Sequence, residues 1–240
     1  MDYFNEIYLK RLNRYGLDYQ SRIQGQRERL FEEYLLKSLY RVDFLYNGEV
    51  VPATFERYKQ DETETLHYLL TRTNINIPPG TILQIPDKDN ITNPWMVYWL
   101  EHINASGYNR YIMLKMSHVL TWKARDGKTY STPAYMYGQE DNMLKDEIRS
   151  RSRMDTLYAE NLKMSFFVMP INENLKRDDY FTVGEGKLKE AYRVTGYDIQ
   201  STKGVEYVTV DPVYLRDESL APIQDEDDNP DDFFWLNGGA

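Results

Sequence analysis

Residues 66–74 read LHYLLTRTN and open a series of four apolar or alternating runs that ends at residue 116. The later runs are PPGTILQIPD at 78–87, PWMVYWLEHI at 94–103 and NRYIMLKM at 109–116, with Gly107 in the turn before the last. Short runs of alternating apolar residues, separated by turn residues, are typical of antiparallel β-strands. This stretch therefore predicts a small β-module.

The same order of runs returns about 96 residues later, where Tyr207 takes the place of Tyr111. The second series consists of LKMSFFVMPIN at 162–172, RDDYFTVGEG at 177–186, EAYRVTGYDI at 190–199 and VEYVTV at 205–210. Direct identity between the two series is low, so chance similarity stays open beside duplication. A duplicated strand module without a reactive set of side chains favours an architectural protein over an enzyme.

Composition bounds the class of protein. The chain has 240 residues, 41% of them hydrophobic and 14% aromatic, which is enough to bury a proper core. It has no Cys, which excludes disulfides, cysteine zinc sites and thiol nucleophiles. We expect no signal peptide, because the N-terminus lacks an apolar stretch, and no membrane-spanning segment.

The charge is concentrated at the C-terminal end. Residues 211–240 hold nine acids and one base, and so carry −8 of the formal net charge of −9. The rest of the chain is nearly neutral. A protein that grips duplex DNA normally presents a basic body or stripe, and the composition does not indicate one.

The N-terminal segment, residues 1–40, is expected to be helical, most clearly over 27–40. Apolar residues recur there at the spacing of one helical face, and the proposed docking residues on it are Leu30, Phe31, Tyr34 and Leu35. Two interpretations stay open. The helix packs on its own β-module, or it docks on a neighbouring subunit or partner.

The expected fold is mainly β, with this helical segment, one or two small antiparallel β-barrels or sandwiches, a helical insert near 141–151 and an extended C-terminal arm. Asn47-Gly48 and Asp126-Gly127 predict tight hairpins, and 110–122 predicts a single strand. The expected divisions are 1–40 for the helical segment, 41–138 for the first β-module, 139–161 for a charged helical connector, 162–213 for the second β-module and 214–240 for the arm.

The arm combines an acidic run with four large apolar residues. The run PIQDEDDNPDD repels itself and favours an extended chain. Phe233, Phe234, Trp235 and Leu236 follow it, and such residues need cover from water. They either fold back on their own domain or dock on a neighbouring subunit, and we include them among the proposed docking residues.

Motifs for catalysis, cofactor binding or metal binding are not found. His67, His102 and His118 lack metal-ligand spacing and are interpreted as packing residues. The sequence carries neither a Walker loop nor a G-x-S-x-G elbow. We therefore assign no catalytic, cofactor-binding or metal-binding residues, expect no cofactor, and expect the protein not to be an enzyme.

The runs PPGTILQIPD, PWMVYWLEHI and NRYIMLKMSHVLTWKARDGKTYSTPAYMYG resemble the β-barrel core of tailed-bacteriophage head–tail connector proteins, of the head-closure, stopper or collar class. The resemblance covers about residues 42–137 and, through the duplication, 162–213. The apparent second copy and the Phe-Phe-Trp-Leu tail depart from the family pattern. They leave open which ring of the connector the chain would form.

The resemblance implies a virion structural protein assembled in the host bacterial cytoplasm. It implies a homo-oligomeric ring in the neck, in contact with the portal or adaptor and with tail proteins. Its channel would retain double-stranded DNA and pass it at ejection, without sequence-specific contact and without a membrane partner. A nearly neutral body suits such a channel, because it does not grip phosphates.

An alternative from another class stays open. An acidic tail ending in large apolar residues also resembles the partner-recruiting C-terminal tails of single-stranded-DNA-binding proteins. Those proteins carry an OB-like barrel with stacking aromatic side chains. Against this alternative, the body is not basic and four residues follow Leu236.

Overall fold

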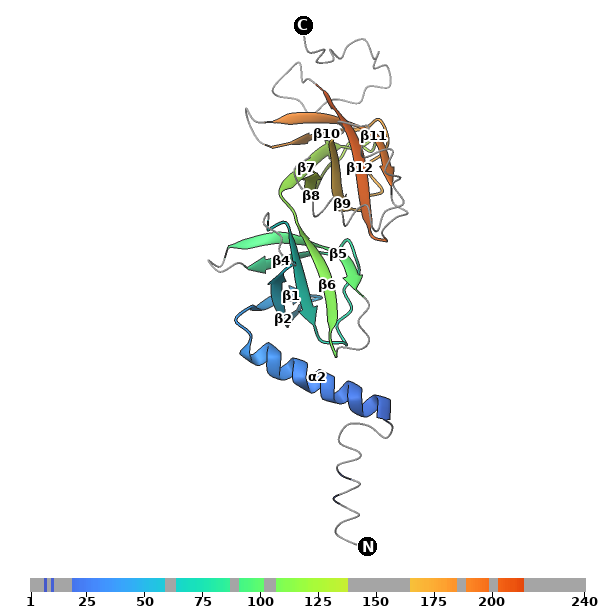
Figure 1. Ribbon diagram of the computed structural model, residues 1–240. Helices are drawn as coiled ribbons and strands as arrows, with labels where there is room; N and C mark the ends of the chain where they lie inside the picture. The colour runs from blue at the N-terminus through green and yellow to red at the C-terminus, as the bar shows by residue number, and fades with distance from the viewer. Residues whose placement is uncertain are drawn as a thin grey trace. The chain divides into compact units, whose positions relative to one another are not determined.

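The computed structural model describes residues 7, 10, 19–58, 64–86, 91–101, 107–137, 165–184, 189–198 and 203–213. Within these ranges the protein is mainly β, with one N-terminal helix and two six-stranded antiparallel barrel-like sheets (Figure 1). The predicted insert at 141–151 and arm at 214–240 lie outside the described residues. In the described part of the chain, no helix combines the length and hydropathy that crossing a membrane requires.

Helix α2 spans Tyr19–Lys37, which confirms a helix over much of the predicted N-terminal segment. Polar pairs one turn apart support it. The side-chain amide of Gln24 donates to Glu28 at 2.9 Å, and Arg29 pairs with Glu33 at 3.2 Å. Lys37 in the last turn places a positive charge at the negative end of the helix dipole.

The first sheet has the strand order β1-β2-β3-β6-β5-β4. Its strands are β1 (Arg41–Tyr46), β2 (Glu49–Arg57), β3 (Leu66–Thr71), β4 (Ile82–Pro86), β5 (Thr92–Glu101) and β6 (Asn109–Lys115). The predicted hairpin is confirmed at β1–β2, where Asn47 and Gly48 have φ angles of 52° and 82°. Both angles suit a two-residue type I′ turn.

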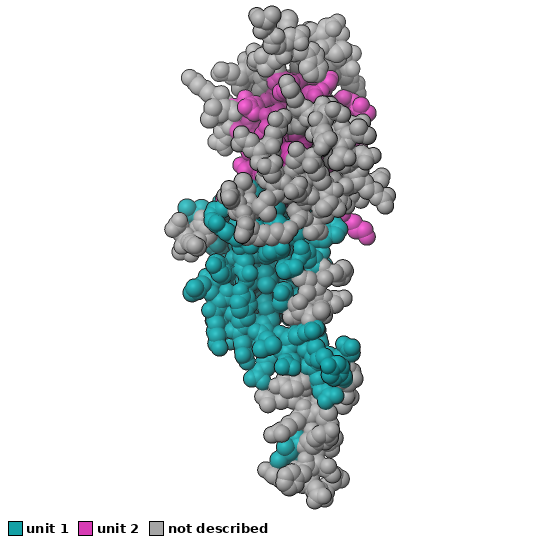
Figure 2. Space-filling view, viewed as in Figure 1, with its two compact units in different colours: residues 1–78, 83–113 teal, residues 79–82, 114–240 magenta. Residues whose placement is uncertain are grey.

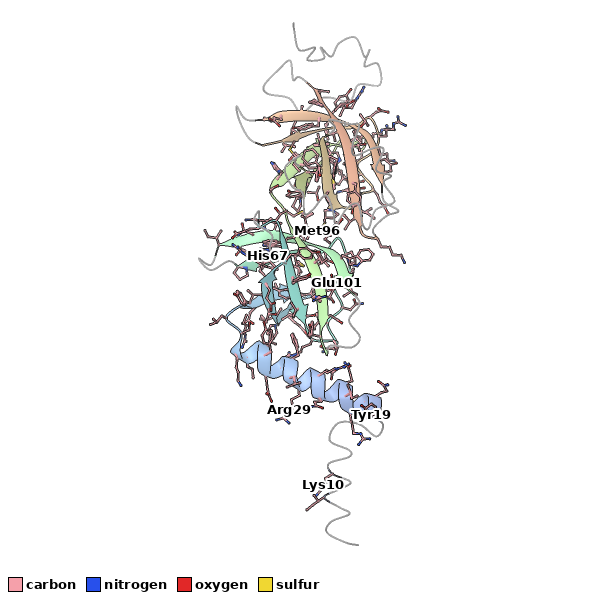
Figure 3. All side chains as sticks on the ribbon, viewed as in Figure 1. Lys10, Tyr19, Arg29, His67, Met96 and Glu101 are labelled. Carbon is pink, nitrogen blue, oxygen red and sulfur yellow. The ribbon has the colours of Figure 1, made fainter. Side chains whose placement is uncertain are left out.

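Strand β5 is buried on both faces over its central residues. Trp95 and Val97 lie in the core of the sheet, where they pack with residues from the other strands. Met96 and Tyr98 point to the opposite face and are also fully buried, with exposed fractions of 0%. Figure 3 labels Met96 on this sheet. A strand in which apolar and polar residues strictly alternate buries one face and exposes the other; β5 instead has apolar residues on both faces.

The second sheet closes on itself in the order β7-β8-β9-β12-β11-β10. Its strands are β7 (His118–Lys123), β8 (Thr129–Tyr137), β9 (Ser165–Pro170), β10 (Tyr180–Val183), β11 (Glu190–Asp198) and β12 (Val205–Val213). Large aromatic side chains fill the barrel, among them Trp122, Phe167 and Phe181, each 0% exposed. This barrel is therefore a packed core.

The chain divides into two compact units, coloured separately in Figure 2. Unit 1 comprises Met1–Pro78 and Leu83–Met113, and unit 2 comprises Pro79–Ile82 and Leu114–Ala240. The predicted boundary after residue 138 is corrected, because β7 and β8 pair with β10 and β9 of the barrel. The predicted single strand over 110–122 is two strands, and the break between them is where the chain leaves one sheet for the other.

The two sheets repeat one topology over six strands each. Read from the first hairpin of each, both follow the order first, second, third, sixth, fifth, fourth. The loop after the third strand repeats as well. The carbonyl of Asn76 accepts a hydrogen bond from the Tyr46 hydroxyl, and the carbonyl of Asn174 accepts one from the Trp122 indole N–H. The apolar residue after each asparagine is buried in its own core. The predicted repeat is confirmed as a repeat of structure.

The units differ in closure. In unit 2, β10 pairs with β7 in a continuous register: Phe181↔Trp122, Thr182↔Thr121 and Val183↔Leu120. In unit 1 the corresponding strands, β4 and β1, are the two ends of an open order in the described residues. Pro86 ends β4 and has no N–H to donate to a further strand. Unit 1 therefore keeps an edge at β1 that unit 2 has eliminated.

Candidate functional site

One face of helix α2 is buried within the chain's own unit. Phe31 and Leu35 are 4% and 2% exposed and pack with Leu70 of β3. The Phe31 ring centroid lies 5.1 Å from that of Tyr108. Of the two interpretations of the N-terminal helix, packing on its own β-module is therefore correct for Phe31 and Leu35. The prediction that Phe31 and Leu35 dock on a neighbouring subunit is corrected accordingly.

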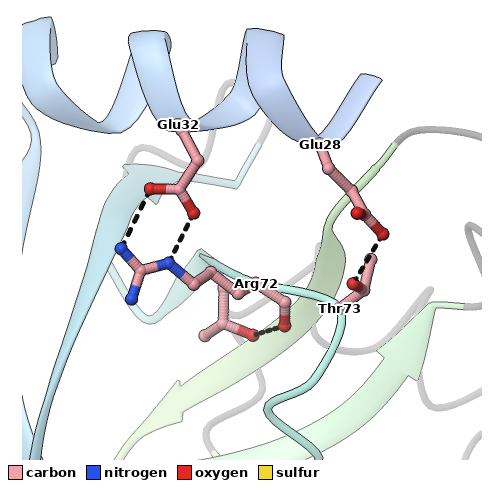
Figure 4. Close-up of polar contacts among 5 residues, drawn as sticks. Glu28, Glu32, Arg72 and Thr73 are labelled. Carbon is pink, nitrogen blue, oxygen red and sulfur yellow. Dashed lines mark hydrogen bonds and ion pairs between the residues drawn. The ribbon is translucent and has the colours of Figure 1, made fainter. Parts of the chain in front are cut away.

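Polar contacts hold the same helix in place (Figure 4). The Arg72 guanidinium donates to both carboxylate oxygens of Glu32, at 2.5 and 2.9 Å, and the Thr73 hydroxyl donates to Glu28 at 3.0 Å. Hydrogen bonding to Arg72 lowers the pKa of Glu32. Both partners follow directly after β3, so the helix is fixed to one end of that strand.

Gly107 permits the close approach of the helix. It has a φ of 78°, and a Cβ added there would lie 2.5 Å from the backbone carbonyl carbon of Arg27. An L-residue is disfavoured by the left-handed backbone and is also obstructed by the helix. The sequence indicated Gly107 only as a turn, and its contact with α2 was not predictable from local pattern.

The flank of the helix that remains exposed carries the other two predicted docking residues. Leu30 is 57% exposed and Tyr34 is 43% exposed. The Tyr34 hydroxyl donates to Glu56 of β2 at 2.6 Å, so its ring is oriented while one side stays accessible. Figure 3 labels Tyr19 and Arg29 on the same helix. Leu30 and Tyr34 remain candidate docking residues, and Phe233, Phe234, Trp235 and Leu236 lie outside the described residues.

A second exposed apolar group comes from the end of α2, the turn that follows it and the β1–β2 hairpin of unit 1. We call it the edge group, and it consists of Leu36, Leu39, Tyr40, Leu45 and Val50, with exposed fractions of 71%, 98%, 55%, 65% and 69%. Leu45 and Val50 are cross-strand partners on the β1–β2 hairpin. Exposed apolar residues beside an unpaired strand edge are a typical site of protein association. Local sequence pattern does not indicate this surface, because its residues come from a helix end, a turn and a hairpin.

Unit 2 contains buried carboxylates that serve its own loops. Burial raises the pKa of Glu206 to about 7, and its side chain accepts the Asn172 backbone N–H at 3.2 Å. Asp179 is 1% exposed, accepts the Lys176 N–H at 2.8 Å and lies 3.8 Å from Arg125. Each carboxylate binds a backbone group of the loop between β9 and β10, so both support that loop.

The histidines that the structure describes are packed against aromatic rings. His67 stacks on Phe55 with centroids 4.6 Å apart and meets the edge of Trp95 at 4.7 Å, and it is labelled in Figure 3. His118 lies with its ring edge toward Phe167. Within the described ranges, no group of three or more His, Asp or Glu side chains is placed to hold a metal ion.

Comparisons with known proteins add little to this geometry. No family model matches the chain, and no curated protein matches it. Solved structures of MrkH from K. pneumonia, described as a c-di-GMP-dependent transcription regulatory factor, superpose with a TM-score of 0.25 at 8% identity, over 81% of this chain and 84–85% of theirs. The apo form of MrkH gives 0.25 at 9% identity, over 81% and 85%. Superpositions this weak carry no argument about fold or function.

Proposed function

We propose that this chain is a bacteriophage virion protein that forms a homo-oligomeric ring in the head–tail connector, or neck, of a tailed phage. Its role there is structural: head closure beside the portal or adaptor, contact with tail proteins, and a channel that retains DNA and passes it at ejection. It has no catalytic activity. The ring assembles in the host bacterial cytoplasm and is then part of the virion.

The observation that carries the proposal is the contrast between the two units. Two β-units of one strand order form the scaffold, and one of them presents an open edge, an exposed edge group and an exposed helix flank. Such a chain exposes apolar side chains and an unpaired strand edge that its own core does not cover. A ring-forming protein needs surfaces of this kind on each copy, because every subunit contacts two neighbours. The resemblance of residues 42–137 to connector barrels supplies the class of assembly.

The charge pattern supports a channel that does not hold DNA tightly. Several arginines of the described surface are paired with carboxylates: Arg29 with Glu33, Arg41 with Asp43, Arg57 with Glu64, Arg72 with Glu32, Arg110 with Glu101 and Arg193 with Asp211. A paired guanidinium has less to offer a phosphate than an unpaired one. Weak phosphate contacts allow duplex DNA to slide through.

The test is assembly of the purified chain. We expect native mass spectrometry and negative-stain images to show a closed ring, alone or with a co-expressed portal or adaptor ring. Leu30→Asp should weaken the ring, because it places a charge on the exposed helix flank. Gln26→Asp, at an exposed position one turn earlier on the same helix, is the matched control and should leave the ring intact.

Two outcomes would overturn the proposal. The first is a strictly monomeric protein that is absent from purified virions. The second is salt-dependent affinity for single-stranded oligonucleotides, which would favour the alternative drawn from the acidic tail. Both sheets have six strands, and only that of unit 2 closes into a barrel in the described residues, whereas an OB fold is a five-stranded barrel; the strand count therefore gives that alternative no support.

A further inference from the structure

The free edge of β1 has a defined set of outward backbone groups. The two-residue turn at Asn47-Gly48 makes Tyr46↔Glu49 a hydrogen-bonded pair, and such pairs alternate along an antiparallel hairpin. The N–H and C=O groups of Asp43 and Leu45 therefore point away from β2. No other strand of the described residues meets them there.

The exposed side chains along this edge are complementary to the same series run in the opposite direction. In order they are Leu39 in the turn before β1, then Arg41, Asp43 and Leu45 on the strand, apolar at the ends and oppositely charged in the middle. Leu39 is 98% and Leu45 65% exposed, and the side chains of Arg41 and Asp43 are 41% and 49% exposed. Laid antiparallel on a second copy about Val42, Arg41 faces Asp43 twice and Leu39 faces Leu45 twice.

The backbone agrees with this register. A pairing centred on Val42 places Arg41 opposite Asp43, and both belong to the set whose backbone groups point outward. Hydrogen-bonded pairs therefore form where opposite charges meet. Val42 and its symmetry mate become a non-hydrogen-bonded pair, with Cα atoms about 4.5 Å apart. Opposite-charge and apolar cross-strand pairs each favour such a sheet.

We infer that the β1 edge of unit 1 binds the β1 edge of a second copy of this chain, antiparallel, with a two-fold axis beside Val42. The contact is isologous, so it makes a dimer and does not generate a ring by itself. It goes beyond the proposed ring and does not depend on it. In the free protein this contact pairs the exposed backbone groups of the β1 edge, which prevents aggregation through further strand pairing.

The contacts that must give way are weak. Arg41 reaches Asp43 of its own strand at 3.5 Å across exposed surface, and the Arg41 N–H lies 3.4 Å from the Ser38 carbonyl. Both separations are long for a hydrogen bond. A strand pair of this length buries less surface than stable complexes do. The dimer is therefore weak and depends on protein concentration.

Charge exchange tests the register. Arg41→Asp places two acids opposite each other at two positions of the dimer, and Asp43→Arg does the same with bases. Each change should weaken dimerisation about tenfold or more in sedimentation equilibrium. The double variant Arg41→Asp with Asp43→Arg should restore it, and Arg29→Asp on α2 should leave it unchanged. If the double variant is as weak as either single one, the proposed register is wrong.

A disulfide tests the axis, in a chain that has no cysteine of its own. Val42→Cys should give a disulfide-linked dimer under mild oxidation, because cross-strand Cα atoms about 4.5 Å apart lie within disulfide range. Val50→Cys, 69% exposed on β2, is the control that should not link efficiently. Failure of Val42→Cys to link overturns the proposal, as does a link that appears only after residues 225–240 are deleted, which would assign the edge to the arm. Ring images of the same variants report on the proposed function separately.

Discussion

Unit 1 and unit 2 share one strand order, yet only unit 2 pairs its first and fourth strands. In unit 2, β7 and β10 join and the barrel has no edge; in unit 1, β1 and β4 end an open order in the described residues. The edge of unit 1 carries exposed Leu45 just before Tyr46, where β7 of unit 2 has half-buried Thr121 just before Trp122. Closure and exposure therefore differ together between two units of the same strand order: unit 2 is closed, and unit 1 has an open edge beside exposed apolar residues.

The helix marks a second difference. In unit 1, α2 packs on β3 and is held to the residues after that strand. Residues at equivalent positions of the two units have different roles. Gly107 of unit 1 allows α2 to approach closely. Arg110 of unit 1 is equivalent to Glu206 of unit 2, which is buried. A shared topology therefore fixes the strands and leaves each unit free to differ in what covers them.

The largest effect is expected from emptying the closed barrel. Phe181→Ala removes a fully buried ring that contacts Phe167 and Tyr192, and should destabilise unit 2 by about 3–5 kcal/mol. Hydrogen exchange followed by mass spectrometry should show lost protection in β7 and β10, with β3 and β6 unaffected. Leu83→Ala, at the matching place in unit 1, should give the reverse pattern. Equal loss in both units would mean that they unfold as one, and the comparison would fail.

The next effect concerns helix α2 of unit 1, the helix that the described residues contain. Gly107→Ala should cost about 1–2 kcal/mol for the left-handed backbone, and more because the added Cβ meets the backbone of Arg27. Gly48→Ala is the control, since Gly48 has a φ of 82° with no atom within 4 Å of an added Cβ. Exchange in α2 should rise for Gly107→Ala alone. Equal effects of the two substitutions would show that α2 does not need the close approach.

The stability of unit 2 should depend on pH through Glu206, in a way that the stability of unit 1 does not. Glu206 has a pKa raised by burial to about 7, against 4.5 in the unfolded chain, so the folded state resists its ionisation. Stability of unit 2 should therefore be full below about pH 4.5 and fall as pH rises to 7, by about 1–3 kcal/mol. Glu206→Gln keeps an acceptor for Asn172 and should abolish that loss.

Urea unfolding of both proteins between pH 4.5 and 8 measures this effect. The difference between wild type and Glu206→Gln isolates Glu206, because His118, whose pKa burial lowers, is common to both and acts in the opposite direction. Arg110 of unit 1 pairs with Glu101 at 2.5 Å and should show no such dependence. A flat difference across this range would exclude a raised pKa at Glu206.

The smallest effect is expected at the ion pair that holds the helix. Arg72→Met should destabilise unit 1 by about 0.5–1 kcal/mol, since both side chains of the pair are partly exposed and screened by water. Added salt should reduce the difference between wild type and variant. Because the pair lowers the pKa of Glu32, its contribution should also fade as pH drops through the acid range, and Arg72→Met should remove that dependence. A double-mutant cycle with Glu32→Gln gives the coupling directly.

Much of the fold was predictable from local pattern. The four-run series at 66–116 and 162–210 became β3 to β6 and β9 to β12, and the hairpins at Asn47-Gly48 and Asp126-Gly127 are present. These features depend on residues a few positions apart. The assignment of 118–137 to the first β-module was wrong, because β8 finds its partner β9 beyond a long intervening segment. No local signal reports such a pairing.

The candidate site was less predictable. The spacing of apolar residues predicted that Leu30, Phe31, Tyr34 and Leu35 share one face of the helix. The sheet covers only part of that face. Phe31 and Leu35 are buried and the other two remain exposed. The edge group was not predicted. Leu45 and Val50 lie in a hairpin, and only the order of strands in the sheet shows that β1 is at its edge.

The sequence by itself determined most of the secondary elements and turns of the described ranges, the Cys-free and nearly neutral body, and the repetition of a strand series. Each of these follows from composition or from contacts within a few residues. Only the tertiary structure decided where one unit ends, which barrel closes and which helix residues are covered. Those outcomes depend on pairings between residues far apart in the chain, where backbone hydrogen bonds and buried area select one partner among several strands of similar pattern.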